Sequence, residues 1–251
     1  MIKKRIIASI LVNNGHAVQS FGYEQYLPLG DPKILVENLA RWKVDEIVIT
    51  DISCSRTQSS IDFDLISDVA NISKGTPIIY GGGITSSKEA SLVIQSGADR
   101  IVIENAFVKN KLIPEEVAGE IGSQAVIMSL PIIIKDNNTF YYDYINKKNI
   151  QLSTLETLIN NPFISEFLIT DVKNEGSIYE VFNMELIENS FFENLDIICN
   201  GGIHSNEICN TLLNKNNVKA IMIGNKLNHS ELSYLNIKNK VSTRAQNHLR
   251  F

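Results

Sequence analysis

The sequence is poor in the residues that metal and disulfide chemistry require. Its 251 residues include only three cysteines, four histidines and one tryptophan. Neither the cysteines nor the histidines have the spacing of a zinc site. We therefore expect no metal and no cofactor, and we interpret the cysteines as reduced thiols that pack in the core. These residues are Cys54, Cys199 and Cys209, with His16, His204, His229 and His248.

Strong charge and long apolar runs are also absent. The chain has 23 basic and 28 acidic side chains, a formal net charge of −5, which weighs against nucleic acid as the main partner. No apolar run reaches the roughly 18 residues that a membrane helix needs. Strand-like sequence begins at Ile6, so we expect no secretory leader. These features predict a cytoplasmic protein with no membrane and no nucleic-acid partner.

Short apolar segments alternate with helix-length amphipathic segments along the chain. The short segments are apolar throughout, which is typical of parallel strands buried on both faces. Among the helices, 31–42 has a proline in its first turn, and 86–97 has a serine cap and a closing glycine. The pattern predicts one (βα)8 TIM barrel domain over residues 1–251. Its strands are expected at 5–12, 46–50, 77–80, 100–104, 125–130, 166–170, 195–200 and 218–224.

One segment departs from this rhythm. Residues 131–145 read "PIIIKDNNTFYYDYI", in which two β-rich runs flank Asp136, Asn137 and Asn138. Turn residues between such runs are typical of a β-hairpin. We therefore expect a hairpin insertion after strand five, on the face where barrel active sites are built.

Motifs also recur at half the length of the chain. "TDI" at 50–52 returns as "TDV" at 170–172, and the glycine turn in "IIYGGGITSS" at 78–87 returns in "IICNGGIHSN" at 197–206. Repetition at a fixed spacing indicates internal duplication. We expect two related halves of four strand–helix units each.

The repeated glycine turns favour phosphate binding. A glycine turn followed by a helix presents backbone N–H groups and a partial positive charge, and barrels often use the loops after strands seven and eight for this purpose. The alternative is that these glycines only permit tight turns. In the first half Glu104 would repel phosphate. Two such sites predict a phosphorylated ligand, bound by Gly82, Gly83 and Asn105 on one side and by Gly201, Gly202, Gly224 and Asn225 on the other.

Further polar residues lie near the predicted carboxyl ends of the strands. Asp51 and Asp171 end strands two and six, and Ser177 lies in the loop that follows strand six. Strand ends on this face carry the chemistry of barrel enzymes. We interpret the three residues as facing a substrate, with a role in holding loops as the alternative for the aspartates.

The ordered motifs resemble the HisF family of histidine-biosynthesis barrels, the cyclase subunit of imidazole glycerol phosphate synthase. The resemblance covers essentially the whole chain, and it depends on the order of the motifs rather than on any single one. The motifs are "KRIIASILV" at 4–12, "GDP" at 30–32, "DEIVITDIS" at 45–53, "GGGI" at 81–84, "GADRIVIENA" at 97–106 and "ITDVKNEGS" at 169–177.

The resemblance implies two catalytic aspartates, at the ends of strands one and five, that transfer protons during ring closure. Here the matching positions hold Leu11 and Pro131, and the nearest polar residue to the second is Ser129. A loop lysine expected after strand one is replaced by Gln19. Leucine and proline cannot transfer a proton, so we expect no catalytic residue at these positions and no cyclase activity.

The resemblance also implies a HisH-like glutaminase partner on the face where the strands begin. In the family a charged ring there gates the entrance of ammonia, and Asp99 matches a residue that contacts the glutaminase. The matching charges stand first in strands one, two, four and six, and we expect them to close an ion-paired ring. The alternative is that they are solvated strand ends. They are Arg5, Glu46, Arg100 and Glu166.

Three functions agree with these residues. The first is an ammonia-conducting subunit of a glutamine amidotransferase complex. A branch of HisF-like proteins with an altered first acid works in bacterial surface-sugar modification, converting an acetamido to an acetamidino group, which implies a sugar amidotransferase as a further partner. The second function is an imidazole glycerol phosphate synthase cyclase with an atypical site. The third is a non-catalytic scaffold or regulator of a glutaminase.

Overall fold

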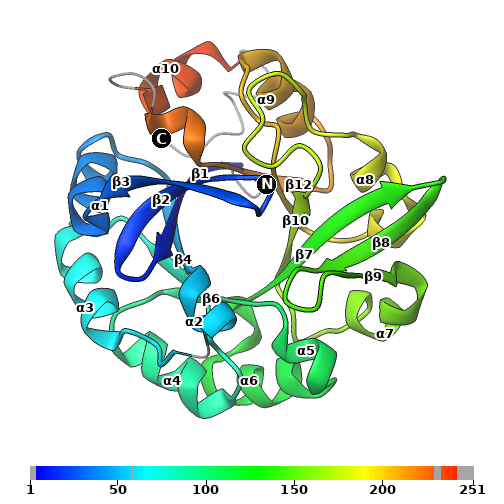
Figure 1. Cartoon of the computed structure of the whole chain (residues 1–251), viewed down its shortest axis with the longest axis horizontal. Coiled ribbons are helices and arrows are strands. Elements are labelled where there is room, and N and C mark those ends of the chain that lie inside the picture. The colour runs from blue at the N-terminus through cyan, green and yellow to red at the C-terminus, as the bar shows by residue number, and fades with distance from the viewer. Residues whose placement is uncertain (1–3, 58, 229–232, 242–251) are drawn as a thin grey trace.

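A computed structural model describes residues 4–57, 59–228 and 233–241. Within them, eight parallel strands close into a ring (Figure 1), because β1 pairs with both β4 and β12, and β10 joins β7 to β11. This confirms the predicted (βα)8 barrel. The barrel strands are β1 (Arg5–Asn13), β4 (Glu46–Asp51), β5 (Ile78–Gly81), β6 (Arg100–Ile103), β7 (Val126–Lys135), β10 (Glu166–Asp171), β11 (Ile197–Asn200) and β12 (Val218–Ile223).

Most helices cover the outside of the ring, whereas α2 lies nearer its centre (Figure 1). The helix α4 (Ser87–Gln95) begins with a capping box, in which Ser86 Oγ accepts from Glu89 N at 3.3 Å and Glu89 accepts from Ser86 Oγ at 3.1 Å. No helix in the described part of the chain is long and apolar enough to cross a membrane. The others are α1 (Pro32–Arg41), α2 (Ile52–Thr57), α3 (Phe63–Ile72), α5 (Ala106–Lys109), α6 (Ile113–Ile121), α7 (Glu156–Ile159), α8 (Glu185–Glu188), α9 (Asn206–Leu213) and α10 (Ser233–Lys240), with 3-10 turns η1 (Ser123–Ala125), η2 (Leu152–Leu155), η3 (Ser190–Phe192) and η4 (Asn225–Asn228).

An antiparallel extension grows from barrel strand five. The strand β7 turns back into β8 (Asn138–Asp143), which then pairs with β9 (Lys148–Gln151). The turn consists of Asp136 and Asn137, whose φ angles of 50° and 60° are those of a two-residue hairpin turn. This hairpin lies within the segment 131–145, for which the sequence predicts one.

A second extension, which the sequence analysis did not predict, grows from barrel strand one. The strand β1 turns back into β2 (His16–Phe21), which pairs with β3 (Gln25–Gly30). The turn contains Asn14 and Gly15 with φ angles of 50° and 75°. An Asn-Gly pair is a strong hairpin signal. Strands one and five lie on opposite sides of the ring, so the two extensions approach its mouth from opposite sides (Figure 1).

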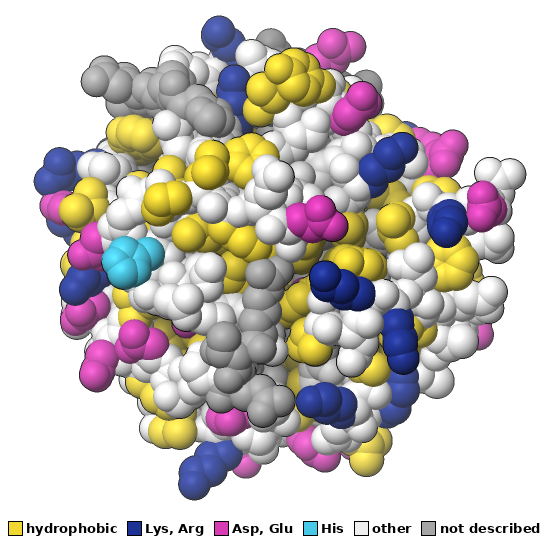
Figure 2. All heavy atoms as spheres, viewed as in Figure 1, with side chains coloured by type: hydrophobic (Ala, Val, Ile, Leu, Met, Phe, Trp, Pro, Cys, Tyr) yellow, Lys and Arg dark blue, Asp and Glu magenta, His cyan; other side chains and the backbone are white. Residues whose placement is uncertain are grey.

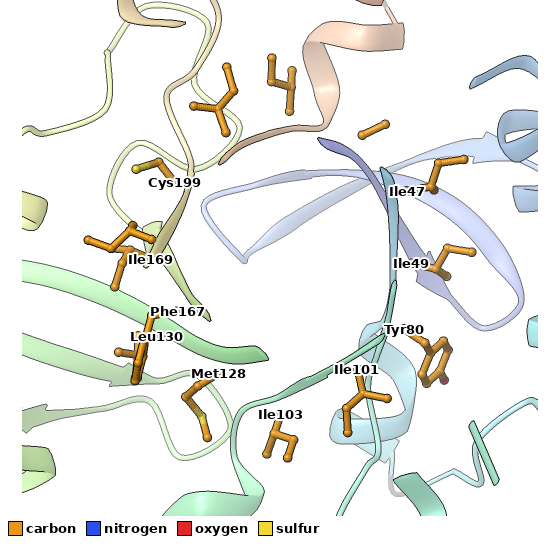
Figure 3. Close-up of a cluster of buried hydrophobic side chains, with 14 of the residues drawn as sticks. Ile47, Ile49, Tyr80, Ile101, Ile103, Met128, Leu130, Phe167, Ile169 and Cys199 are labelled. Carbon is orange, nitrogen blue, oxygen red and sulfur yellow. The ribbon is translucent and has the colours of Figure 1, made fainter. Parts of the chain in front are cut away.

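The strand side chains divide into two sets. Outward residues, such as Ile47 and Ile49 on β4, point away from the barrel axis and pack beneath the helices (Figure 3). Inward residues form a separate buried cluster on the axis, which we call the apolar layer. It consists of Ile7, Val48, Ile79, Val102, Ile127, Leu168, Ile198, Ala220 and Met222.

Glycines after strands three and seven allow a close backbone contact. A Cβ atom on Gly82, at φ +116°, would lie 2.2 Å from the carbonyl oxygen of Asp51. A Cβ atom on Gly201, at φ +91°, would lie 2.6 Å from that of Asp171. The same contact therefore occurs at matching places in the two halves. It gives both glycines a packing role that needs no ligand.

We predict that Gly82→Ala destabilises the barrel by more than about 2 kcal/mol, because the methyl group meets backbone that cannot move aside and the φ angle is unfavourable. Gly119→Ala is the matched control, since a Cβ there has open space in α6, and it should be neutral or stabilise by up to about 1 kcal/mol. Urea unfolding of both variants measures the difference. Equal stability of the two variants would contradict the packing role of Gly82.

Candidate functional site

A cavity of about 960 Å³ opens at the carboxyl ends of the barrel strands. On the face that Figure 2 shows, hydrophobic side chains lie among polar ones. The structure brings both predicted glycine turns to this one cavity, because all seven predicted phosphate-binding residues line it. They are Gly82, Gly83, Asn105, Gly201, Gly202, Gly224 and Asn225.

A ring of mostly polar inward residues lines the inner end of the cavity, one strand pleat beyond the apolar layer. In a strand every second side chain points inward. Thr50 therefore follows Val48, and Thr170 follows Leu168. We call this ring the inner polar layer. Its members, all of which line the cavity, are Ser9, Thr50, Gly81, Glu104, Ser129, Thr170 and Asn200.

Glu104 is the ionisable residue of this layer. Its Oε2 accepts a hydrogen bond from Ser129 Oγ at 2.6 Å, and its Oε1 lies 3.4 Å from Asn105 Nδ2. Burial raises the pKa of Glu104 to about 7, because the hydrogen bond from Ser129 offsets only part of that effect and the charge of Asp143 adds to it. Glu104 is therefore a cavity carboxyl group that changes charge near neutral pH.

The β2–β3 loop is fixed across one side of the mouth. Glu175, in the loop after β10, accepts hydrogen bonds from Ser20 Oγ at 3.0 Å and from Tyr23 N at 3.2 Å. Its carbonyl oxygen accepts from Gly22 N at 3.0 Å. The Tyr23 ring also lies 5.8 Å from that of Tyr144, between β8 and β9. The two extensions thus meet over the cavity.

Two of the predicted phosphate ligands already have protein partners. Asn225 Nδ2 donates to the carbonyl oxygen of Ser20 at 2.7 Å, which holds β2 in place. Asn105 Oδ1 accepts from the Tyr141 hydroxyl at 3.2 Å. These contacts give both side chains a structural role.

The residues predicted to face a substrate have different positions. Asp51 lines the cavity, but its carboxylate also accepts from Ser53 N at 2.9 Å and caps α2. Ser177 lines the cavity, and its hydroxyl accepts from Glu180 N at 2.9 Å.

Asp171 lies outside the residues that line the cavity. It is 3% exposed, and it accepts from Asn174 Nδ2 and from Asn183 N, each at 2.8 Å. Burial raises its pKa in spite of these hydrogen bonds. Asp171 therefore holds the loop that follows β10, which was the alternative role considered for it.

The positions that match the family's catalytic acids are apolar in the structure as in the sequence. Leu11 lines the cavity. Pro131 is buried in β7, between the end of the pairing with β6 at Met128 and the start of the pairing with β8 at Ile132. Gln19 is buried in β2, at 8% exposure. None of these three supplies a proton-transfer group to the cavity.

At the opposite end, four charged side chains extend across the barrel where its strands begin. Arg5 Nη1 lies 3.1 Å from Glu46 Oε1, and the other guanidinium nitrogen pairs with Glu166. Arg100 Nη1 lies 2.5 Å from Glu166 Oε2. Because β11 and β12 separate β1 from β10 in the ring, the Arg5–Glu166 pair bridges the end of the barrel. We call Arg5, Glu46, Arg100 and Glu166 the floor.

The floor is an open chain of ion pairs, where a closed ring was expected. Its order is Glu46, Arg5, Glu166, Arg100, and no ion pair between Glu46 and Arg100 is found in the described part of the chain. The strand β5, which lies between β4 and β6, contributes no charge at its start. Arg100 instead donates to Ser165 Oγ at 2.8 Å and to the carbonyl oxygen of Gln124 at 3.1 Å.

The two glutamates of the floor are buried and its two arginines are partly buried, and the hydrogen bonding of the floor is incomplete. Burial raises the pKa of Glu46 more than Arg5 and Arg100 lower it. Burial opposes the charge of Arg5, but Glu166 and Glu46 outweigh it and raise its pKa. Glu166 Oε2 has no partner with hydrogen-bond geometry in the described residues, but it lies 2.5 Å from Arg100 Nη1. Arg5 Nε is buried with no hydrogen-bond partner in the same part of the chain. Such groups are costly to bury and are rare in folded proteins.

The remaining candidates are Asp99 and the four histidines, two of which lie outside the described residues. Asp99 is exposed beside the floor, and its carboxylate accepts from Ile78 N at 2.8 Å. The described residues contain no group of three His, Cys, Asp or Glu side chains that could hold a metal ion. His16 is exposed, His204 lines the cavity, and His229 and His248 lie outside the described residues.

The fold and the site define this protein as a (βα)8 barrel with a cavity at the carboxyl ends of its strands and a charged floor at their start. The chain belongs to the histidine biosynthesis protein family, which it matches over residues 5–233. It is HisF-like within that family. It is 28% identical over 206 residues to a putative imidazole glycerol phosphate synthase subunit hisF2 of Vibrio vulnificus, covering 81% of this chain and 75% of that protein.

Two further relatives are named imidazole glycerol phosphate synthase subunit HisF. The protein of Lachnoclostridium phytofermentans is 27% identical over 244 residues, which cover 95% of this chain and 93% of the relative. That of Exiguobacterium sp. is 27% identical over 206 residues, which cover 80% of each chain. The resemblance seen in the motifs therefore extends over most of the sequence.

The sequence analysis missed several residues that line the cavity. Thr50, Thr170 and Asn200 stand on the inward face of their strands, and counting every second residue from the charged strand starts would have located the two threonines. Tyr23 and Glu175 had no comparable signal. They come together through a contact between residues about 150 positions apart.

We predict that Glu104 makes stability fall as pH rises from about 5 to 7. Its pKa is raised from an ordinary 4.5 to about 7, so in this window the folded chain keeps a proton that the unfolded chain releases. The free energy of unfolding of Glu104→Gln, relative to that of the native chain, should therefore increase by on the order of 2 kcal/mol between pH 5 and pH 8. Urea unfolding at each pH measures this.

Glu89→Gln is the matched control. Burial opposes the charge of Glu89, but hydrogen bonds from Thr85 and Ser86 outweigh it and lower its pKa. Glu89 should stabilise the fold at neutral pH, and this stabilisation should be lost as pH falls through its lowered pKa. The trend is the opposite of that expected for Glu104. A difference between native and Glu104→Gln chains that does not change with pH would contradict the assignment.

Proposed function

We propose that this chain is the ammonia-accepting barrel subunit of a glutamine amidotransferase complex. A HisH-like glutaminase binds the face where the strands begin, and ammonia passes along the barrel axis to the cavity. The observation that carries the proposal is the order of layers on one axis: the charged floor, the apolar layer and the inner polar layer. The relatives are named as subunits of a synthase, which supports a partner chain.

The floor supports a gating role because its ion pairs have incomplete hydrogen bonding and are therefore expected to contribute little to stability. A buried ion pair offsets its desolvation cost only with good geometry and further hydrogen bonds. Here Arg5 Nε lacks such a bond, and the pairing is open between Glu46 and Arg100. A partner that supplies hydrogen bonds to this face changes the balance and opens the chain of ion pairs.

The proposed acceptor is a sugar whose acetamido group is converted to an acetamidino group in a cytoplasmic complex with a sugar amidotransferase. Leu11 and Pro131 in place of proton-transfer groups favour this function over the histidine-pathway cyclase. The names of the relatives favour the cyclase as the second candidate. A non-catalytic scaffold is the third. A glutaminase that binds this barrel but passes no ammonia into it would favour that last function.

We predict that a HisH-like glutaminase from the same organism binds the chain and that Asp99→Asn weakens the complex several-fold. The amide oxygen of the introduced asparagine can still accept from Ile78 N, so the fold should be unchanged while the exposed charge is lost. The loss should appear mainly in the association rate, as is usual for a charge at the rim of an interface. Asp136→Asn, in the β7–β8 turn on the opposite face, is the control. Surface plasmon resonance measures both rates.

We also predict that the chain, supplied with ammonium salt, does not turn over the ribonucleotide substrate of the histidine-pathway cyclase. Loss of a general acid or base typically costs about 10² to 10⁴ in rate for each group. The HisF subunit of Lachnoclostridium phytofermentans serves as the positive control. A rate within tenfold of that control would overturn the first candidate and establish the cyclase.

A further inference from the structure

Glu104 carries the one carboxyl group in the inner polar layer of the barrel. It belongs to the inner polar layer, which is the first layer of polar groups beyond the apolar layer. Among the seven residues of the inner polar layer, Glu104 alone is ionisable. The other members offer hydroxyl, amide or backbone groups.

The carboxyl group is held in position but is not neutralised by the protein. Ser129 Oγ donates to it at 2.6 Å from the neighbouring strand β7. None of the ion pairs between described residues includes Glu104. Burial raises the pKa of Glu104, and the charge of Asp143 adds to that effect. Lys109 and Lys226 also line the cavity, but neither forms an ion pair with Glu104 in the described structure. A partly buried carboxylate without a cation carries a desolvation cost, and a cationic ligand offsets that cost.

The apolar layer limits which nitrogen species can pass from the floor to the inner polar layer. A charged ion pays a large desolvation cost among aliphatic side chains, whereas neutral ammonia does not. In the inner polar layer a nitrogen species meets hydroxyl acceptors, such as those of Ser9 and Thr50, together with one carboxyl group. An ammonium group donates several hydrogen bonds and carries one positive charge, so this layer matches it in both respects.

We propose that the inner polar layer is a binding site for an ammonium ion or a primary ammonium group, with Glu104 as its counterion and Ser129 as the residue that positions the carboxylate. The inference deepens the proposed function, which supplies the source of the nitrogen. The site itself needs no partner chain. The cation binds the ionised carboxylate, so affinity rises as pH rises through about 7, roughly tenfold between pH 6 and pH 8.

The test follows the carboxyl carbon of Glu104 by NMR in a chain labelled with ¹³C-glutamate, with the signal assigned from its absence in Glu104→Gln. Ammonium chloride replaces sodium chloride at constant ionic strength. We expect a saturable change and a fall of about one unit or more in the pKa of Glu104. Potassium chloride controls for ion size. Glu89, on the cavity rim and already bonded by Thr85 and Ser86, is the internal control.

Ser129→Ala tests the positioning role, and it should weaken ammonium binding several-fold while leaving the Glu104 signal present. No ammonium-dependent change at Glu104, or an equal change with potassium, would overturn the site. The barrel is tested alone, so the two proposals fail separately. Ammonium binding without glutaminase binding would overturn the proposed function only, and glutaminase binding without ammonium binding would overturn this inference only.

Discussion

Every feature of the barrel axis depends on one constraint, the alternation of side chains along eight strands that close into a ring. Once Arg100 points inward at the start of β6, Val102 and then Glu104 must point inward above it. In β10 the same alternation makes Glu166, Leu168 and Thr170 point inward. A charged floor, an apolar layer and a polar layer therefore follow from the register alone. A shift of one residue in any of these strands would turn its floor charge out among the helices.

The two ends of the barrel balance charge in different ways. At the floor, Glu166 is shared by Arg5 and Arg100, so the negative charge is matched within the protein. In the cavity, Glu104 has a hydroxyl partner and no cation in the described residues. Leu11 and Pro131 contribute no acidic group to the cavity. The carboxyl group of the inner polar layer is that of Glu104, directly after β6, and it is held by Ser129, two residues before Pro131 on β7.

The elements that follow from a local sequence pattern, above all the barrel strands, could be predicted from the sequence. The eight barrel strands appear close to their expected bounds, since apolar runs separated by capped helices leave few alternative folds. The floor charges lie at the strand starts, as expected, but the open pairing between Glu46 and Arg100 depends on the uncharged start of β5. The β2–β3 extension was missed, although Asn14 and Gly15 are a hairpin signal. Contacts across the mouth, such as Glu175 with Tyr23, join distant loops and leave no local pattern.

The proposed passage of nitrogen along the axis can be tested directly in a complex with a HisH-like glutaminase. Glutamine is the only nitrogen source, and an enzymatic scavenger removes ammonia from bulk solution while amide resonances of Gly81 and Asn200 are followed. In the native complex these resonances should change during glutamine turnover. They should stay unchanged with Val48→Phe, which fills the apolar layer. Equal changes in both complexes, or no change in the native one, would contradict a route through the barrel.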